Sequence, residues 1–240
     1  MPDRWDLRPA RDLGLTPGER VRSIGRERGL GSHATAGVWR RLVWALLRGV
    51  YRLRVDGREN LPSPPFVMIG NHASHLDALT LAAALPPSLA GNAFALAAGD
   101  TFFTSGAKAA FAAYAINALP VWRTKTSARD ITELRKRLHE DRAVLILFPE
   151  GTRTRTGAMG SFKPGIGALV AGTAAPVVPC YLHGGFEAWP ASRRWPGPGR
   201  LHLVIGAPLD FSAATKDRAG LNAVSARCEE AVRALASGAS

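Results

Sequence analysis

Cysteine is scarce in this 240-residue chain, which contains only Cys180 and Cys228. Two cysteines 48 positions apart provide neither a disulfide framework nor the spacing of a metal site, so no metal centre is expected. Because disulfide-poor proteins are typical of reducing compartments, such a compartment is the default interpretation. Each cysteine lies in a strand-like or helical run without a reactive-thiol motif, and we interpret both as small core residues.

Acidic residues are also under-represented. The chain has 31 Lys and Arg against 19 Asp and Glu, a formal net charge of +12. The excess is concentrated at the beginning, because residues 1–58 hold thirteen arginines and six carboxylates. A basic N-terminal region indicates an anionic partner, either a nucleic acid or an anionic membrane surface.

Long apolar runs are missing as well. Residues 1–37 are rich in Arg, Gly and Asp with weak periodicity, which predicts a poorly ordered basic arm with a short helix near residues 18–28. Asp3, Asp6 and Asp12, together with the lack of an apolar segment, argue against a secretory signal.

Residues 38–54 have the pattern of an amphipathic, basic helix. Its five arginines exclude an ordinary membrane-spanning helix, whereas a basic helix with tryptophans suits the plane of a membrane interface. The alternative is a helix that packs on the domain with its arginines in solvent. No recognised nucleic-acid motif accompanies the charge, so we expect no nucleic-acid partner. The apolar stripe consists of Trp39, Leu42, Val43, Leu46, Val50 and Leu53.

The remainder, residues 55–240, alternates between strand-like and helical segments and predicts one domain. This order predicts an α/β fold with a mostly parallel or mixed sheet flanked by helices. Strands are expected near residues 55–57, 66–69, 93–98, 119–122, 143–148, 177–182 and 201–205. Helices are expected near residues 78–85, 105–116, 127–140, 165–174 and 220–236.

His72 and Asp77 lie where the strand at 66–69 passes into the helix at 78–85. A neutral imidazole accepts a proton from a substrate hydroxyl best when a carboxylate holds its other ring nitrogen. Ser74 lies between them, but no Gly-x-Ser-x-Gly elbow surrounds it. The simplest interpretation is a base that activates a hydroxyl brought by the substrate.

A second group of polar residues follows the strand at 143–148. Gly151 permits close backbone approach, Thr152 supplies a hydroxyl, and Arg153 offers a planar fork that binds phosphate. Glu150 could orient this arginine or a substrate hydroxyl. Two further cations, Arg123 and Lys163, are candidates for the same anion site.

Four blocks of sequence resemble those of the glycerolipid acyltransferases of the 1-acylglycerol-3-phosphate acyltransferase type. Residues 71–77, Asn-His-Ala-Ser-His-Leu-Asp, resemble the N-H-x-S-x-x-D block, and residues 148–153 match the F-P-E-G-T-R block. Residues 119–123, which end in Arg123, resemble an intermediate block, and residues 177–179 resemble a final apolar-proline block. The resemblance covers roughly residues 55–210.

The resemblance implies transfer of a fatty acyl chain from acyl-CoA or acyl-carrier protein to the hydroxyl of lysophosphatidic acid, giving phosphatidic acid. It implies a peripheral or monotopic enzyme at the cytoplasmic face of a membrane, with the acyl thioester as co-substrate and no cofactor. By it, His72 is the general base and Asp77 its orienting partner. The implied acceptor-phosphate site comprises Arg123, Glu150, Gly151, Thr152, Arg153 and Lys163. The apolar region 93–121 is expected to line an acyl channel.

Other hypotheses remain open. Trp122 and the Trp- and Pro-rich segment 189–199 favour a different lysophospholipid or a lyso-aminolipid as acceptor. A hydrolase that uses Ser74 as nucleophile is a further alternative. A non-enzymatic basic adaptor for a membrane surface or a nucleic acid would leave the motifs unexplained. We assign His75 a structural or solvent-facing role.

Overall fold

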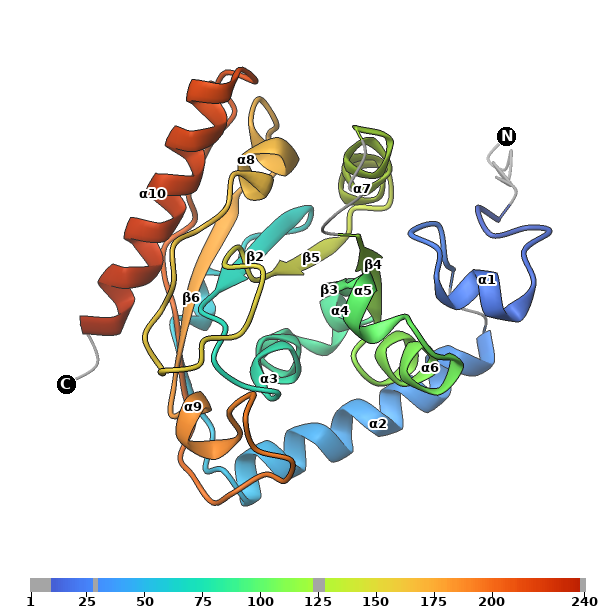
Figure 1. The fold of residues 1–240 in the computed structure, drawn as a ribbon, viewed down its shortest axis with the longest axis vertical. Coiled ribbons are helices and arrows are strands. Elements are labelled where there is room, and N and C mark those ends of the chain that lie inside the picture. Colours follow the sequence, from blue (N-terminus) through green and yellow to red (C-terminus); the bar gives the residue numbers. More distant parts are fainter. Residues whose placement is uncertain (1–9, 28–29, 123–127, 238–240) are drawn as a thin grey trace, which may run out of the picture.

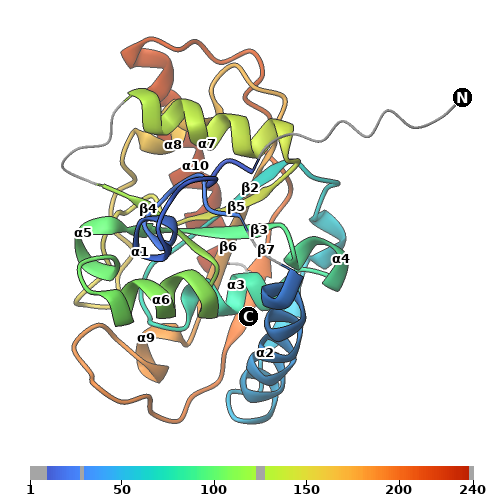
Figure 2. The same ribbon diagram turned by 90° about the vertical axis from the view of Figure 1, so that its right-hand side faces the viewer.

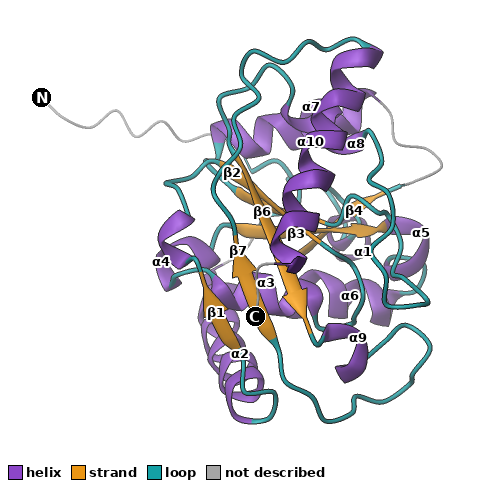
Figure 3. Cartoon of the chain, turned by 90° about the vertical axis from the view of Figure 1, so that its left-hand side faces the viewer, coloured by secondary structure: helices purple, strands orange, loops and turns teal. Residues whose placement is uncertain are grey.

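The structure is a computed structural model in which residues 10–27, 30–122 and 128–237 are described. It contains a seven-stranded sheet with the order β1-β7-β6-β2-β5-β3-β4 (Figures 1 and 3). Neighbouring strands are parallel except β6 and β7, which are antiparallel, so the predicted mixed α/β sheet is confirmed. The strands are β1 Arg54–Asp56, β2 Phe66–Gly70, β3 Ala93–Ala98, β4 Ala118–Val121, β5 Val144–Leu147, β6 Val177–His183 and β7 His202–Ile205.

The two strands that precede the candidate motifs are neighbours in the middle of the sheet. β2 and β5 run parallel with Ile69 opposite Leu147, near the carboxyl end of each strand. The chain therefore leaves both strands at the same edge of the sheet, where open α/β sheets place their ligands. Strand pairing thus brings together two motifs that are more than 70 residues apart in the sequence.

Helices cover both faces of the sheet (Figures 1 and 2). One face carries α2 Leu30–Gly49, α3 Asp77–Ala84 and α6 Gly106–Ala115. The other carries α7 Ala128–Glu140, α8 Gly165–Val170 and α10 Arg218–Ser237. The shorter helices are α1 Pro17–Val21, α4 Pro87–Ala90, α5 Gly99–Phe102 and α9 Gly185–Ala188, and Arg58–Asn60 form a 3₁₀ turn.

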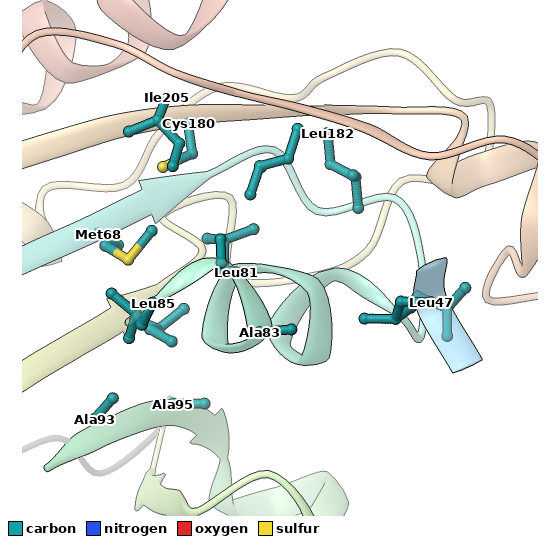
Figure 4. Packing of buried hydrophobic residues seen from close by; sticks show 14 of the residues in the cluster. Leu47, Met68, Leu81, Ala83, Leu85, Ala93, Ala95, Cys180, Leu182 and Ile205 are labelled. Atoms are coloured by element: carbon teal, nitrogen blue, oxygen red, sulfur yellow. The ribbon is translucent and has the colours of Figure 1, made fainter. Parts of the chain in front are cut away.

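β2 is buried on both faces, which explains why its sequence is a continuous apolar run. Phe66 and Met68 join the cluster beneath α2 and α3, whereas Val67 and Ile69 join the cluster beneath α7, α8 and α10. Figure 4 shows the first cluster, in which Leu81 of α3 lies near Met68 and Leu47 enters from α2. The rigid centre of the fold thus lies directly behind the two motif loops.

Of the basic arm predicted at residues 1–37, residues 10–27 pack on the domain, whereas residues 1–9 and 28–29 lie outside the described residues. Arg26 is 3% exposed and donates hydrogen bonds to the carbonyl oxygens of Ala113 (2.7 Å) and Ala118 (3.0 Å) and to Oδ1 of Asn117 (2.9 Å). These groups lie at the C-terminal end of α6 and the start of β4. A cation that donates to the last carbonyls of a helix stabilises it. Such a long-range contact could not be predicted from the sequence, because residues 1–37 show little periodicity.

The basic amphipathic helix predicted at 38–54 begins earlier, at Leu30, and ends at Gly49. After it, Arg52 adopts φ 48°, and the N–H of Leu53 donates to the carbonyl of Leu47 (3.0 Å). The helix packs on the domain through Val43 and Leu47, while most of the predicted stripe is exposed. Among the described helices, none combines the length and the apolar character that crossing a bilayer requires.

Candidate active site

His72 and Asp77 form a hydrogen-bonded pair at the edge of the sheet. His72 follows β2, Asp77 is the first residue of α3, and the His72 Nδ1 to Asp77 Oδ2 distance is 2.8 Å. Oδ2 also accepts the backbone N–H groups of Ala73 and Ser74, both at 2.8 Å. The Asp77 side chain is 1% exposed and that of His72 is 21% exposed.

This geometry determines which imidazole nitrogen can act as a base. A carboxylate at Nδ1 favours the tautomer in which Nδ1 carries the proton, so that the lone pair of Nε2 remains free. The Phe148 ring stacks on the imidazole, with centroids 4.3 Å apart, and fixes its plane. His72 is therefore arranged to accept a proton from a hydroxyl at Nε2.

Glu150 joins the two motif loops. Its Oε1 accepts the backbone N–H of His72 (2.6 Å) and its Oε2 accepts that of Gly160 (2.8 Å). Burial raises the pKa of this carboxyl, and the two N–H donors act against that rise. The sequence left open whether Glu150 orients Arg153 or a substrate hydroxyl. In the structure its carboxylate fixes the backbone of the loop that carries His72.

Arg153 lies against the imidazole of His75. Its Nη1 is 2.7 Å from Nε2 of His75 and also contacts Nδ1. Burial, with smaller contributions from Arg153 and His72, lowers the pKa of His75 to about 4. The imidazole is therefore neutral near pH 7 and adds no charge beside Arg153. The sequence assigned His75 a structural or solvent-facing role, and in the structure its imidazole contacts Arg153 and lines the cavity described below.

Gly151 provides space for a second cation. It adopts φ 72°, and a Cβ atom placed on it would lie 2.8 Å from Nζ of Lys163. Lys163 is exposed and thus lies beside the loop that carries Thr152 and Arg153. The structure brings five of the predicted phosphate-site residues into one region, although Glu150 has the different role described above. Arg123 lies outside the described residues.

An apolar cavity of about 350 Å³ adjoins His72, the histidine of the His72–Asp77 pair. Its polar lining includes His72, Thr152 and Arg153. Much of its apolar wall comes from the region 93–121, the region that was expected to line an acyl channel. Phe111 of α6 lines the cavity and is also 60% exposed, so the cavity reaches the surface of that helix. The apolar wall from this region consists of Ala95, Leu96, Ala97, Ala98, Phe102, Phe111, Ile116 and Val121.

Ser74 does not have the geometry of a nucleophile. Its hydroxyl donates to the carbonyl of Trp189 (3.0 Å) and accepts the N–H of Leu76 (3.2 Å), and its residue is 1% exposed. Within the described residues, no hydrogen bond joins this hydroxyl to the imidazole of His72. These contacts oppose the hydrolase hypothesis.

Trp189 is a site residue that the sequence did not reveal. Its carbonyl accepts the His75 N–H (3.1 Å), and its ring lies 4.8 Å from that of His75. It also lines the cavity. In the sequence, this residue was visible only as part of the Trp-, Pro- and Arg-rich segment that follows β6. The position of that segment beside the loop of His72 depends on the fold.

Comparisons with known proteins agree with these observations. The family model described as Acyltransferase matches residues 52–183, a range that includes both motif loops. A relative from Arabidopsis thaliana, "1-acyl-sn-glycerol-3-phosphate acyltransferase LPAT1, chloroplastic", is 30% identical over 168 residues, which cover 68% of this chain and 45% of that protein. "1-acyl-sn-glycerol-3-phosphate acyltransferase" of Pseudomonas aeruginosa is 30% identical over 173 residues, which cover 71% of this chain and 65% of that protein.

A solved structure shares the fold. The crystal structure of the 1-acyl-sn-glycerophosphate (LPA) acyltransferase PlsC from Thermotoga maritima superposes with a TM-score of 0.66 at 21% identity. The match covers 90% of this chain and 85% of that chain. The chain spans about half the length of the curated plant relatives it matches. Because the family model matches more than half of the sequence, the chain belongs to the acyltransferase family.

Proposed function

We propose that this protein transfers a fatty acyl chain from an acyl thioester to the free hydroxyl of 1-acylglycerol-3-phosphate, which yields phosphatidic acid. The observation that carries the proposal is the His72–Asp77 pair, which adjoins both an apolar cavity and Arg153. The names of the relatives in plants and Pseudomonas aeruginosa agree with this reaction.

His72 is the general base in the proposed reaction. Its Nε2 removes the proton of the acceptor hydroxyl as the oxygen attacks the thioester carbonyl, while Asp77 stabilises the imidazolium that forms. When the tetrahedral intermediate collapses, the carbon–sulfur bond breaks and His72 returns the proton to the leaving thiolate. The acyl group passes directly between the two substrates.

The apolar cavity holds the acyl chain of the donor in this proposal. Its walls from β3 and α6 offer apolar surface, and Phe148 and Leu147 continue that surface towards His72. An extended hydrocarbon chain gains about 0.8 kcal/mol for each buried CH₂ group. The donor itself is acyl-CoA or acyl-carrier protein, which acts as a co-substrate, and the reaction uses no further cofactor.

Arg153 binds the phosphate of the acceptor, with Lys163 as a second cation and Arg123 as a third. The guanidinium is half-buried, and its planar fork matches two phosphate oxygens. Thr152 and Gly151 line the same cavity and supply a hydroxyl and a close backbone approach. The anchored phosphate then fixes the distance of the free hydroxyl from His72.

The acceptor and product are lipids, and α2 supplies a surface for a peripheral or monotopic contact with an anionic membrane. Leu42 is 60% exposed and Leu46 is 51% exposed on one side of the helix, and Val50, directly after its last residue, is 57% exposed. Arg41 and Arg48 are exposed on the same helix and suit anionic headgroups. We place this surface on the cytoplasmic leaflet.

The test is acyl transfer by the purified chain in vesicles, with labelled acyl-CoA and acyl-carrier protein offered separately. Lysophosphatidic acid is compared with other lysophospholipids and a lyso-aminolipid. His72→Ala is expected to lower kcat roughly 10²–10⁴-fold. Arg153→Ala is expected to raise KM for lysophosphatidic acid by roughly 10–100-fold with little change for the thioester, because it removes a charge-assisted contact.

His139→Ala is the matched control for His72, since it removes an exposed histidine on α7. Turnover by a folded His72→Ala variant at the wild-type rate would contradict the mechanism. Transfer to another lysophospholipid in preference to lysophosphatidic acid would retain the chemistry and reject the acceptor.

A further inference from the structure

The segment 190–200, here called the basic tryptophan loop, connects α9 to β7 and has no role in the proposed chemistry. Residues 191–196 are all exposed, and Trp195 is 70% exposed, the largest exposed fraction of any described aromatic side chain. The loop contains three arginines and no carboxylate. An exposed tryptophan beside arginines has the composition of a contact with an anionic membrane interface.

The loop lies between the cavity and α2. At its beginning, Trp189 lines the cavity and bonds to the catalytic loop through its carbonyl. At its end, the N–H of Leu201 donates to the carbonyl of Tyr51 (3.0 Å), and the N–H of Arg54 donates to the carbonyl of Leu201 (2.9 Å). Figures 1 and 2 show the loop and the C-terminal end of α2 at the same end of the molecule.

The conformation of the loop is maintained from within. The indole N–H of Trp189 donates to the carbonyl of Arg193 (3.1 Å), and Arg193 donates to the carbonyl of Glu187 (3.2 Å). The guanidinium of Arg194 lies 5.7 Å from the ring centre of Trp195. Arg194 and Trp195 therefore form an exposed cation–aromatic pair on a loop whose base is fixed.

We propose that the basic tryptophan loop is a second membrane contact, in which Trp195 enters the interface of an anionic bilayer and Arg194 binds lipid phosphates. The inference extends the membrane association proposed for α2. Tryptophan has an apolar body and a polar N–H group, and is enriched at the level of lipid headgroups. Residues 38–53, which include most of α2 and its connection to β1, and residues 191–200 of this loop together contain seven arginines and no acidic residue.

Two separate contacts at the same end of the molecule would orient the enzyme. A single amphipathic helix lets a domain rotate about the helix axis, whereas a second contact point removes that freedom. With both in contact, the catalytic edge of the sheet faces the bilayer that contains the acceptor. An acidic carrier protein is the alternative binding partner for the arginines of the loop. The exposure of Trp195 and the proximity of α2 favour a lipid surface.

The first test is partitioning of the full-length chain onto vesicles of phosphatidylcholine, with and without phosphatidylglycerol. Arg194→Gln is expected to lower partitioning about fivefold on the anionic vesicles and little on the neutral ones, since one arginine near the surface contributes about 1 kcal/mol. Trp195→Ser is expected to lower it roughly fivefold or more on both. Arg218→Gln, an equal change of charge at the exposed start of α10, is the control.

The second test reports depth directly. Cys180 and Cys228 are buried, so Ser192→Cys introduces a selectively reactive thiol within the described residues. An environment-sensitive fluorophore at position 192 is expected to shift to shorter wavelength on anionic vesicles, whereas the same label on Ala213→Cys is not. An unshifted label at 192 on vesicle-bound protein would overturn the proposal.

Activity separates this inference from the proposed function. With acyl-CoA and acceptor dispersed in detergent micelles, Arg194→Gln and Trp195→Ser are expected to retain wild-type kcat. If both variants bound vesicles normally but lost activity only with acyl-carrier protein, the loop would be a carrier site and the membrane contact would be rejected. Inactivity of the wild type with every acceptor would reject the proposed function and leave the vesicle measurements valid.

Discussion

Two 20-residue helices on opposite faces of the sheet, α2 and α10, use their apolar residues in opposite ways. α10 buries Val224, Cys228 and Val232, and its exposed charges form pairs such as Arg227 with Glu230 (2.7 Å). On α2, Val43 and Leu47 are buried, while Leu42 and Leu46 are exposed.

The difference shows that amphipathicity alone does not say which surface covers the apolar side of a helix. For α10, the protein core is that surface, and burial contributes to the stability of the fold. For α2, the core covers only the strip that contains Val43 and Leu47, and the adjacent apolar strip with Leu42 and Leu46 is left for the proposed contact with the membrane. Substitution can therefore separate the packing of α2 on the core from its proposed membrane contact.

The largest expected effect comes from breaking the exposed strip. Leu42→Asp combined with Leu46→Asp is expected to weaken vesicle binding by about 3–6 kcal/mol, because two leucine side chains no longer enter the bilayer. The free energy of unfolding should change little, since both residues are exposed. Flotation with vesicles and denaturant unfolding measure the two quantities. Equal binding by the wild type and the double variant would show that α2 is an ordinary surface helix.

The adjacent residue gives the reverse result. Leu47 is fully buried at 0% exposure, and Leu47→Ala is expected to lower the free energy of unfolding by about 2–5 kcal/mol through lost contacts and a cavity. Leu46→Ala is its matched control, with an expected change below about 0.5 kcal/mol. Urea unfolding of the pair measures the contrast. Similar losses from both would mean that α2 is not oriented as described.

The arginines differ in burial in the same way as the leucines, with smaller expected effects on stability. Arg41 and Arg48 on α2 are exposed, whereas Arg26 is buried and bonds to the end of α6. Arg26→Met is expected to cost about 1–3 kcal/mol of stability, because buried acceptors lose their donor. Arg227→Met removes an exposed ion pair with Glu230 and should cost less than about 1 kcal/mol. Thermal unfolding compares the two, and an equal shift would refute the structural role of residues 10–27.

The smallest expected effect is a change in how the free energy of unfolding depends on pH, caused by His75 in the loop before α3. His75 has a pKa of about 4 when folded and an ordinary value near 6.5 when unfolded, so the unfolded chain binds more protons between these values. Stability contributed by the neutral imidazole is complete above pH 6.5 and declines as the pH falls towards 4. His75→Phe should give a shallower decline across this window, and His139→Gln should not. Unfolding curves at several pH values test this.

Much of the fold could be predicted because strands buried on both faces leave a strong pattern. The expected strand at 93–98 coincides with β3, and the apolar runs at 66–69 and 143–148 became β2 and β5. α4, α5 and α9 were missed because helices of four residues are too short to show periodicity. The antiparallel direction of β7 was not predictable, since neighbouring strands do not encode direction in their composition.

In the candidate site too, contacts between residues close in sequence could be predicted, whereas contacts between distant residues could not. His72 and Asp77 were predicted as a pair because they are five positions apart in the chain, a separation that one turn into a helix can close. Glu150 was assigned to a ligand, yet it bonds to the backbone of His72, a residue 78 positions away. The contribution of Trp189 likewise depends on contacts across more than 110 residues.

The sequence by itself determined the strands, the longer helices, the side-chain types of the two motif loops and the excess of positive charge, because periodicity, turn residues and side-chain type act locally. Only the tertiary structure decided which apolar residues of α2 are buried, which arginines face solvent, and which carboxylate holds which loop. Those outcomes depend on strand order and on helices packed from distant parts of the chain. Burial and pairing are properties of the assembled surfaces, and no local pattern contains them.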